Sequence, residues 1–136
     1  MSHFEWPVRV YYEDTDSGGV VYYANYLRFM ERARTEFLRS LGFEQDQLIE
    51  EHDILFAVRN VHVEYHAPAR FNDRLNVSTE IAGRSRASLT FGQRVRRADE
   101  ARVLCSATVN VACLAASSFR PRPLPEFILR EIPNVA

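Results

Sequence analysis

One long amphipathic helix is the feature of this sequence that most constrains its fold. Apolar side chains recur at steps of three and four residues over residues 26–41, a spacing that aligns them on one helix face: Tyr26, Phe29, Met30, Ala33, Phe37 and Leu41. Leu27, Leu38 and the aliphatic part of Arg34 widen this stripe. Gly42 follows as a left-handed stop for the helix. Such a helix has to bury its apolar face against another layer of the domain.

Most of the remaining chain has the two-residue alternation of half-buried strands. We expect five strands, at residues 8–12, 54–65, 75–81, 89–95 and 103–113, with a bulge near Arg59 and Asn60. Short helical turns are expected at residues 45–51 and 126–130. The last four strands are joined by short links, which favour antiparallel neighbours. The order β-α-β-β-β-β therefore predicts one α+β domain over residues 1–136, with the long helix packed on the sheet.

The composition limits the classes of function. With 136 residues the chain is long enough to bury a substantial core. The net charge of -1 argues against a general binder of nucleic acids or anionic membranes. All 17 basic residues are arginine, so a Schiff-base lysine and a Walker-type phosphate lysine are both excluded.

The sequence predicts a cytoplasmic protein. Its start lacks the basic and apolar pattern of a signal peptide, and no apolar run approaches the roughly 20 residues that cross a bilayer. Cys105 and Cys113 fall in one predicted strand, about 26 Å apart at about 3.3 Å per residue, which is too far for a disulfide. We expect both cysteines to be small buried side chains.

The segment from residue 12 to residue 26 combines acids, glycines and a helix start. Asp16 can serve as a nucleophile or a general base, and the nearby charges of Glu13 and Asp14 could tune it. Gly18 and Gly19 let backbone approach a ligand closely. The helix start leaves free N–H groups that can hold an oxyanion. An acidic surface turn is the alternative, and local physics alone favours it.

Other candidate sites are weaker. His62, Glu64 and His66 share a strand face, where a metal site is conceivable and a solvated polar face is favoured. No serine lies in a Gly-x-Ser-x-Gly turn, and the cysteines have apolar neighbours, which argues against nucleophilic serine or cysteine chemistry. Two arginine pairs could bind phosphates, with solvated arginines as the default interpretation: Arg84 with Arg86, and Arg120 with Arg122.

With these features assembled, the sequence resembles the hotdog-fold acyl-CoA thioesterases of the 4-hydroxybenzoyl-CoA thioesterase family. The similarity is to its Tol-Pal-associated (YbgC-type) branch and covers nearly the whole chain. It is carried by the blocks Trp6–Asp16 (WPVRVYYEDTD), Gly18–Tyr22 (GGVVY), Glu31–Glu36 (ERARTE), Val63–Tyr65 (VEY), Ala67–Arg70 (APAR) and Pro121–Pro125 (PRPLP).

The resemblance implies a hotdog fold, in which a five-stranded antiparallel sheet wraps the long helix. It implies hydrolysis of acyl-CoA thioesters, with acyl carrier protein as a further thioester partner, and no metal or separate cofactor. It also implies a homodimer that pairs into a tetramer, with active sites at the subunit interfaces.

The resemblance further assigns roles to residues. Asp16 corresponds to the catalytic carboxylate, and the backbone N–H of Tyr23 to the group that polarises the thioester carbonyl. The substrate-binding positions are Gly18, Gly19, Asn25, Arg86 and Arg122, with the two arginines matching family arginines that contact the CoA phosphates.

One position departs from the branch pattern. The YbgC-type branch usually has histidine where this chain has Tyr23, which removes any proton transfer or acyl selection by that imidazole. Short-chain, aromatic and longer acyl groups all stay open as substrates. Two other classes of function are alternatives to hydrolysis. One is a non-catalytic acyl-CoA or acyl-carrier-binding module associated with envelope machinery. The other is a magnesium phosphotransferase using Asp14 and Asp16, which a one-helix, lysine-free chain fits poorly.

Overall fold

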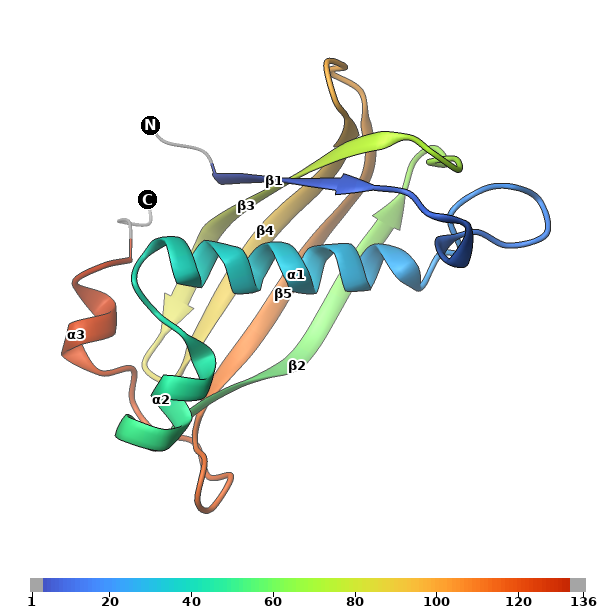
Figure 1. Cartoon of the computed structure of the whole chain (residues 1–136). Helices are drawn as coiled ribbons and strands as arrows, with labels where there is room; N and C mark the ends of the chain where they lie inside the picture. Colours follow the sequence, from blue (N-terminus) through green and yellow to red (C-terminus); the bar gives the residue numbers. More distant parts are fainter. Residues whose placement is uncertain (1–3, 133–136) are drawn as a thin grey trace.

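The computed structural model describes residues 4–132 and arranges them as one long helix lying across a five-stranded sheet (Figure 1). Its elements are β1 (Phe4–Arg9), the 3₁₀ turn η1 (Tyr12–Asp14), α1 (Asn25–Ser40), α2 (Gln45–His52), β2 (Ile54–Tyr65), β3 (Arg74–Ser85), β4 (Ser88–Arg97), β5 (Val103–Ala115) and α3 (Glu126–Leu129). The strand order is β1-β3-β4-β5-β2, and every neighbouring pair is antiparallel. This is the hotdog fold that the sequence predicts.

Helix α1 supplies the centre of the core. Phe29, Met30 and Ala33 have no exposed surface, because the apolar stripe of the helix faces the sheet. The helix ends at Ser40, and Gly42 follows as the predicted left-handed residue, with a φ of 98° and an amide that donates to the Arg39 carbonyl at 3.0 Å. Among residues 4–132, no helix is long and apolar enough to cross a membrane.

The structure corrects the predicted bounds of the first and third strands most, and it lengthens the fourth and fifth strands to Ser88–Arg97 and Val103–Ala115. The first strand runs from Phe4 to Arg9 instead of over residues 8–12, because the Tyr11 amide donates to the Asp14 carboxylate at 2.8 Å and the chain turns there. β3 continues to Ser85, since a bulge after Ile81 absorbs the predicted break at Gly83. The bulge predicted in the second strand is confirmed between Val58 and Asn60.

One position of the predicted apolar stripe is also corrected. Leu27 is 38% exposed, since it stands on the flank of α1 that the sheet does not cover. Arg34, whose aliphatic part was expected to join the stripe, does face inward and lines a pocket between α1 and the sheet.

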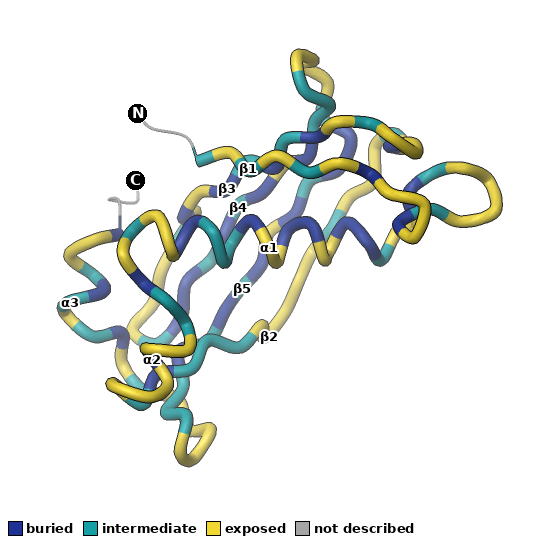
Figure 2. The backbone as a smooth tube through the Cα atoms, viewed as in Figure 1, coloured by how far each residue is buried: buried dark blue, intermediate teal, exposed yellow. Residues whose placement is uncertain are grey.

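The two edges of the sheet differ in how they are protected. β1 has 6 residues and includes Pro7, which cannot donate a ladder hydrogen bond. β2 has 12 residues and no proline, and it carries the exposed side chains of Val58 and Val61. Figure 2 shows the long exposed stretch of β2. A long apolar edge of this kind is a template for pairing with another strand.

Candidate functional site

Asp16 lies in the exposed loop that joins β1 to α1 (the blue loop in Figure 1). The loop closes on itself, because the Asp16 amide donates to the Val20 carbonyl at 3.0 Å and Thr15 pairs with Val21. Asp16 Oδ1 accepts the Gly18 amide at 2.9 Å, while Oδ2 accepts no hydrogen bond within the described residues. One oxygen of the carboxylate is therefore held in place, and the other is open to a reacting molecule.

Both predicted glycines have a structural reason to lie beside this carboxylate. Gly19 has a φ of +77°, a conformation that side chains disfavour, and its amide donates to the Asp16 carbonyl at 3.1 Å. A Cβ atom at Gly18 would lie 3.3 Å from Asp16 Oδ1. Any larger residue at this position would crowd the carboxylate.

Asp14 anchors the loop to the helix, a role that sequence reasoning missed. Its buried carboxylate accepts the Tyr11 amide through Oδ2 and the side-chain amide of Asn25 through Oδ1, each at 2.8 Å. The Tyr22 amide donates to the Asp14 carbonyl, also at 2.8 Å. Because Asn25 begins α1, this network fixes the loop relative to the helix start. No local pattern in the sequence links two polar residues 11 positions apart.

The Asp14 network bears on two interpretations of the sequence. The side chain of Asn25, placed among the substrate-binding residues, is committed to Asp14 within the chain. Both carboxylate oxygens of Asp14 are likewise occupied by internal donors, and the sheet is antiparallel. These observations argue against a magnesium phosphotransferase site shared by Asp14 and Asp16.

The start of α1 offers a backbone N–H group that the described chain does not use. Ala24 is the N-cap residue, and no side chain caps the helix. Within residues 4–132 the Tyr23 amide donates to no acceptor, whereas the Tyr23 carbonyl accepts the Tyr65 hydroxyl at 3.1 Å. A free amide at the positive end of a helix dipole can stabilise negative charge that develops on an oxygen atom.

An aromatic pocket of about 300 Å³ opens beside this amide, lined by Val21, Tyr23, Tyr26, Tyr65, Ala67 and Pro68 with His66. The pKa of Tyr22 is raised, first by the hydrogen bond and charge of the neighbouring Tyr23 side chain, then by burial, and last by the Asp16 carboxylate. The loop brings the carboxylate, the amide and the pocket to one end of the domain.

Arg86 and Arg122 lie at the opposite end. Arg86 is exposed in the turn between β3 and β4, and its carbonyl accepts the Leu124 amide at 2.8 Å. Arg122 Nη1 donates to the His52 carbonyl at 2.9 Å and to the Asp53 carbonyl at 3.3 Å, immediately before β2 begins. Figure 1 shows this end of the sheet, with α2 and the β3–β4 turn, away from the first turn of α1. Within one chain, the two arginines do not meet Asp16.

The remaining candidates form no second site. His62 and Glu64 are exposed on β2, with 3.9 Å between Nε2 and Oε2, and His66 Nε2 lies 3.0 Å from Ser106 Oγ. In the described part of the chain, no group of three or more His, Cys, Asp or Glu residues could hold a metal ion. Burial raises the pKa of the Cys105 thiol to about 12, which keeps this thiol protonated at neutral pH.

Comparison with known proteins extends this picture. The model of the thioesterase-like superfamily matches residues 10–132. The acyl-CoA thioester hydrolase YbgC of Escherichia coli O6:H1 is 50% identical over 128 residues, which cover 94% of this chain and 94% of that protein. The acyl-CoA thioesterase YbgC of Haemophilus influenzae is 46% identical over 123 residues, covering 90% and 89% of the two chains. The structure of a 1,4-dihydroxy-2-naphthoyl-CoA thioesterase from Synechocystis superimposes with a TM-score of 0.88 at 27% identity, covering 96% of each chain.

The Asp14–Asn25 network predicts a stability effect. Replacing Asn25 with alanine leaves the buried carboxylate of Asp14 with one internal donor, which should lower the free energy of unfolding by about 1–3 kcal/mol. Urea unfolding of Asn25→Ala measures this loss. Asn76→Ala, on a half-buried strand position without a side-chain hydrogen bond among the described residues, should change it by about 0.5 kcal/mol or less. Equal losses in the two variants would contradict the anchoring role of Asn25.

Proposed function

The chain belongs to the thioesterase-like superfamily and is an acyl-CoA thioester hydrolase, and we propose that Asp16 and the backbone N–H of Tyr23 carry out the reaction. The observation that carries the proposal is the pairing of an open carboxylate oxygen with an unused amide on one anchored loop. The thioester carbonyl lies between these two groups. Gly18 and Gly19 leave room for its approach.

Asp16 can promote hydrolysis of the thioester by either of two mechanisms. As a nucleophile, its carboxylate oxygen bonds to the carbonyl carbon, the C–S bond breaks, CoA leaves as the thiolate, and water hydrolyses the resulting anhydride. As a general base, it takes a proton from a water molecule whose oxygen bonds to the carbonyl carbon before the C–S bond breaks. In single-turnover hydrolysis in ¹⁸O-labelled water, label in the Asp16 carboxylate identifies the nucleophilic route with water attacking the aspartyl carbonyl of the anhydride. Water attack on the acyl carbonyl labels only the product, as the general-base route does, so trapping of the anhydride with hydroxylamine is the second test of the nucleophilic route.

The Tyr23 amide acts on the carbonyl oxygen in both routes. That oxygen becomes negative when the tetrahedral intermediate forms, and the amide at the start of α1 can donate to it without any change of conformation. The hydrogen bond from the Tyr65 hydroxyl to the Tyr23 carbonyl helps to keep this backbone segment in place. The role belongs to the backbone, so it does not require the histidine that is usual at this position.

Loss of the Asp16 carboxylate should abolish most of the activity. Asp16→Asn keeps the shape of the side chain, but it removes the charge that attacks or accepts a proton, so turnover should fall at least about a hundredfold. Thiol release over a panel of acyl-CoAs measures the loss. Glu5→Gln, which neutralises an exposed acid on β1 outside this loop, should retain activity. Near wild-type turnover by Asp16→Asn, or saturable acyl-CoA binding without thiol release, would contradict the proposal.

We also propose that the protein forms a dimer through the free edge of β2. The support is the length of this edge, its exposed Val58 and Val61, and its lack of proline, compared with the short β1 edge that Pro7 interrupts. Dimers of identical chains usually have two-fold symmetry, so the two β2 strands would run antiparallel and extend both sheets into one. Pairing of dimers into tetramers stays a prediction.

This dimer would complete the active site. The last residue of β2, Tyr65, contacts Tyr23, and its first residues follow the Asp53 carbonyl that binds Arg122. Antiparallel pairing about the middle of β2 sets the beginning of one strand beside the end of the other. Arg122 of one protomer, with Arg86 near it, would then approach the thioester site of its partner and bind the CoA phosphates.

Two other predictions from the sequence concern a second thioester substrate and the location of the protein. Acyl carrier protein stays a second possible thioester donor, for which an assay with acylated carrier protein is the test. A cytoplasmic location is supported by Cys105 and Cys113, which are buried and unbonded, as is usual in a reducing compartment.

A substitution that disrupts the β2 edge should separate the protomers, and it should reduce activity as a consequence. Val61→Asp places a charge in the proposed strand pairing, so the mass in analytical ultracentrifugation should fall from two chains to one chain of 15.7 kDa. Glu5→Lys, a charge change on the exposed edge strand β1, should leave the dimer intact. A dimeric Val61→Asp protein would contradict pairing through β2.

A further inference from the structure

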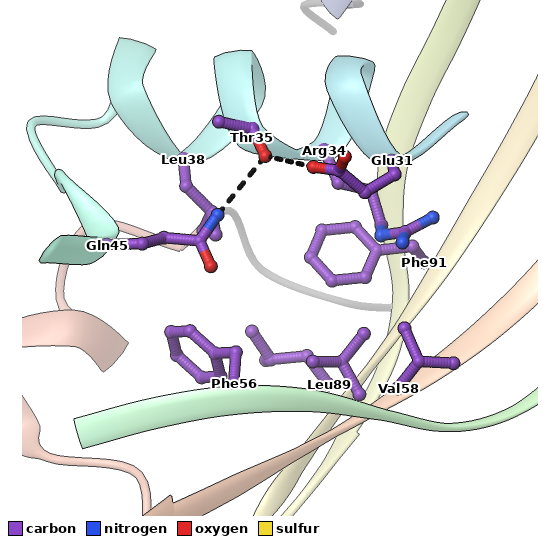
Figure 3. Close-up of a pocket in the computed structure, with 10 residues that line it drawn as sticks. Glu31, Arg34, Thr35, Leu38, Gln45, Phe56, Val58, Leu89 and Phe91 are labelled. Atoms are coloured by element: carbon purple, nitrogen blue, oxygen red, sulfur yellow. Dashed lines mark hydrogen bonds between the residues drawn. The ribbon is translucent and has the colours of Figure 1, made fainter. Parts of the chain in front are cut away.

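A second pocket, of about 110 Å³, lies between α1 and the sheet (Figure 3). Most of its wall is apolar, with Leu38 from the helix above and Phe56, Leu89 and Phe91 from the strands below. Two charged residues of the helix also line the pocket, Glu31 and Arg34. The proposed reaction at Asp16 does not account for this arginine.

The guanidinium of Arg34 is held in place without a counter-ion. Arg34 Nη1 donates to Gln93 Oε1 at 3.0 Å, and no carboxylate within residues 4–132 lies close enough to form an ion pair with it. Gln93 is 1% exposed, and its Nε2 donates to the Met30 carbonyl at 2.9 Å and to Thr79 Oγ1 at 3.0 Å. The arginine is therefore oriented by a neutral, fully bonded amide.

The positive charge of Arg34 is unfavourable in this partly apolar environment. Burial lowers the pKa of Arg34, and the nearby Glu31 carboxylate raises it by a smaller effect. Arg34 is half-buried, and a partly desolvated cation without an ion-pair partner costs stability, so an apolar side chain of similar length would suit the surrounding wall better. The guanidinium keeps donors that Gln93 does not use, and their planar arrangement matches a carboxylate. An anionic group of a ligand would compensate the charge.

The same two-fold pairing of β2 sets this pocket beside the thioester site of the partner protomer. Phe56 and Val58, in the first half of β2, line the pocket, and Tyr65 at the end of β2 contacts Tyr23. Pairing about the middle of β2 brings the first half of one strand opposite the second half of the other. Phe56 then lies about two residues along the strand, or about 7 Å, from the position opposite the partner's Tyr65.

We propose that Arg34 of one protomer binds a carboxylate at the far end of an acyl group whose thioester lies at Asp16 of the other protomer. The preferred substrates are then CoA monothioesters of short dicarboxylic acids, with the methylene chain against the apolar wall and the small pocket limiting its length. This inference rests on the proposed function and on the β2 dimer. Glu31, which lines the same pocket and accepts the Thr35 hydroxyl at 2.7 Å, weakens the attraction without pairing with Arg34.

Hydrolysis of glutaryl-CoA and pentanoyl-CoA tests the inference, since the two acyl groups have the same number of carbons and differ in the terminal carboxylate. The wild-type dimer should have a kcat/KM for glutaryl-CoA at least about tenfold higher than for pentanoyl-CoA. Arg34→Met should remove this preference by lowering kcat/KM for glutaryl-CoA, with pentanoyl-CoA unaffected or improved. Arg34→Lys, which keeps a charge and a donor for Gln93, should retain part of the preference. Glu31→Gln should increase it.

Two further variants separate this inference from the proposed function. Arg32→Met, on the exposed face of the same helix, should leave the substrate ratio unchanged. Asp16→Asn should lose activity toward both substrates, and its failure to do so would overturn the proposed function. An active wild-type enzyme without a preference for glutaryl-CoA would overturn the role of Arg34 and leave the function intact. An equal loss for both substrates in Arg34→Met and Arg34→Lys would overturn it as well.

Discussion

The packing of α1 across the sheet is the constraint on which the site depends. Phe29, Met30 and Ala33 are fully buried against the strands, so neither the position nor the direction of the helix can change without opening the core. That packing fixes the helix start, and the Asp14–Asn25 hydrogen bond fixes the loop relative to it. The packing of α1 and the Asp14–Asn25 hydrogen bond together hold the Asp16 carboxylate and the Tyr23 amide at the same end of the domain.

The second constraint is the β2 strand, which joins the two ends of the domain. At one end of β2, the Tyr65 hydroxyl donates to the Tyr23 carbonyl in the candidate site, and the other end follows a carbonyl that accepts from Arg122. A single chain keeps its candidate catalytic and phosphate-binding groups apart, and its longest free edge runs between them. The proposed two-fold pairing of that edge would satisfy its backbone groups and bring the separated groups together, so one physical requirement would account for both the proposed dimer and the proposed composite site.

The features that depend on local patterns could be predicted from the sequence. The helix from Tyr26 onward, its stop at Gly42 and the bulge near Asn60 follow from periodicity and backbone preference, and the structure confirms them. The predicted end of the first strand was wrong because the Tyr11 amide donates to the Asp14 carboxylate. Alternation of apolar and polar residues cannot predict this hydrogen bond. Long-range partners were not predictable from one sequence: Asn25 bonds to Asp14, and Arg34 to Gln93 from a different element. The roles of Asp16 and the Tyr23 amide came from the family resemblance and stay proposals.

The central claim is that each active site combines Asp16 of one protomer with the arginines of its partner. Refolding a mixture of Asp16→Asn chains and Arg86→Glu/Arg122→Glu chains tests it, because each parent dimer carries a defect in both of its sites. If the sites are composite, each hybrid dimer regains one intact site, and an equal mixture should recover about a quarter of the wild-type thiol release. If each chain carries a complete site of its own, every site in the hybrid keeps one defect. A mixture no more active than its two parents would contradict the account.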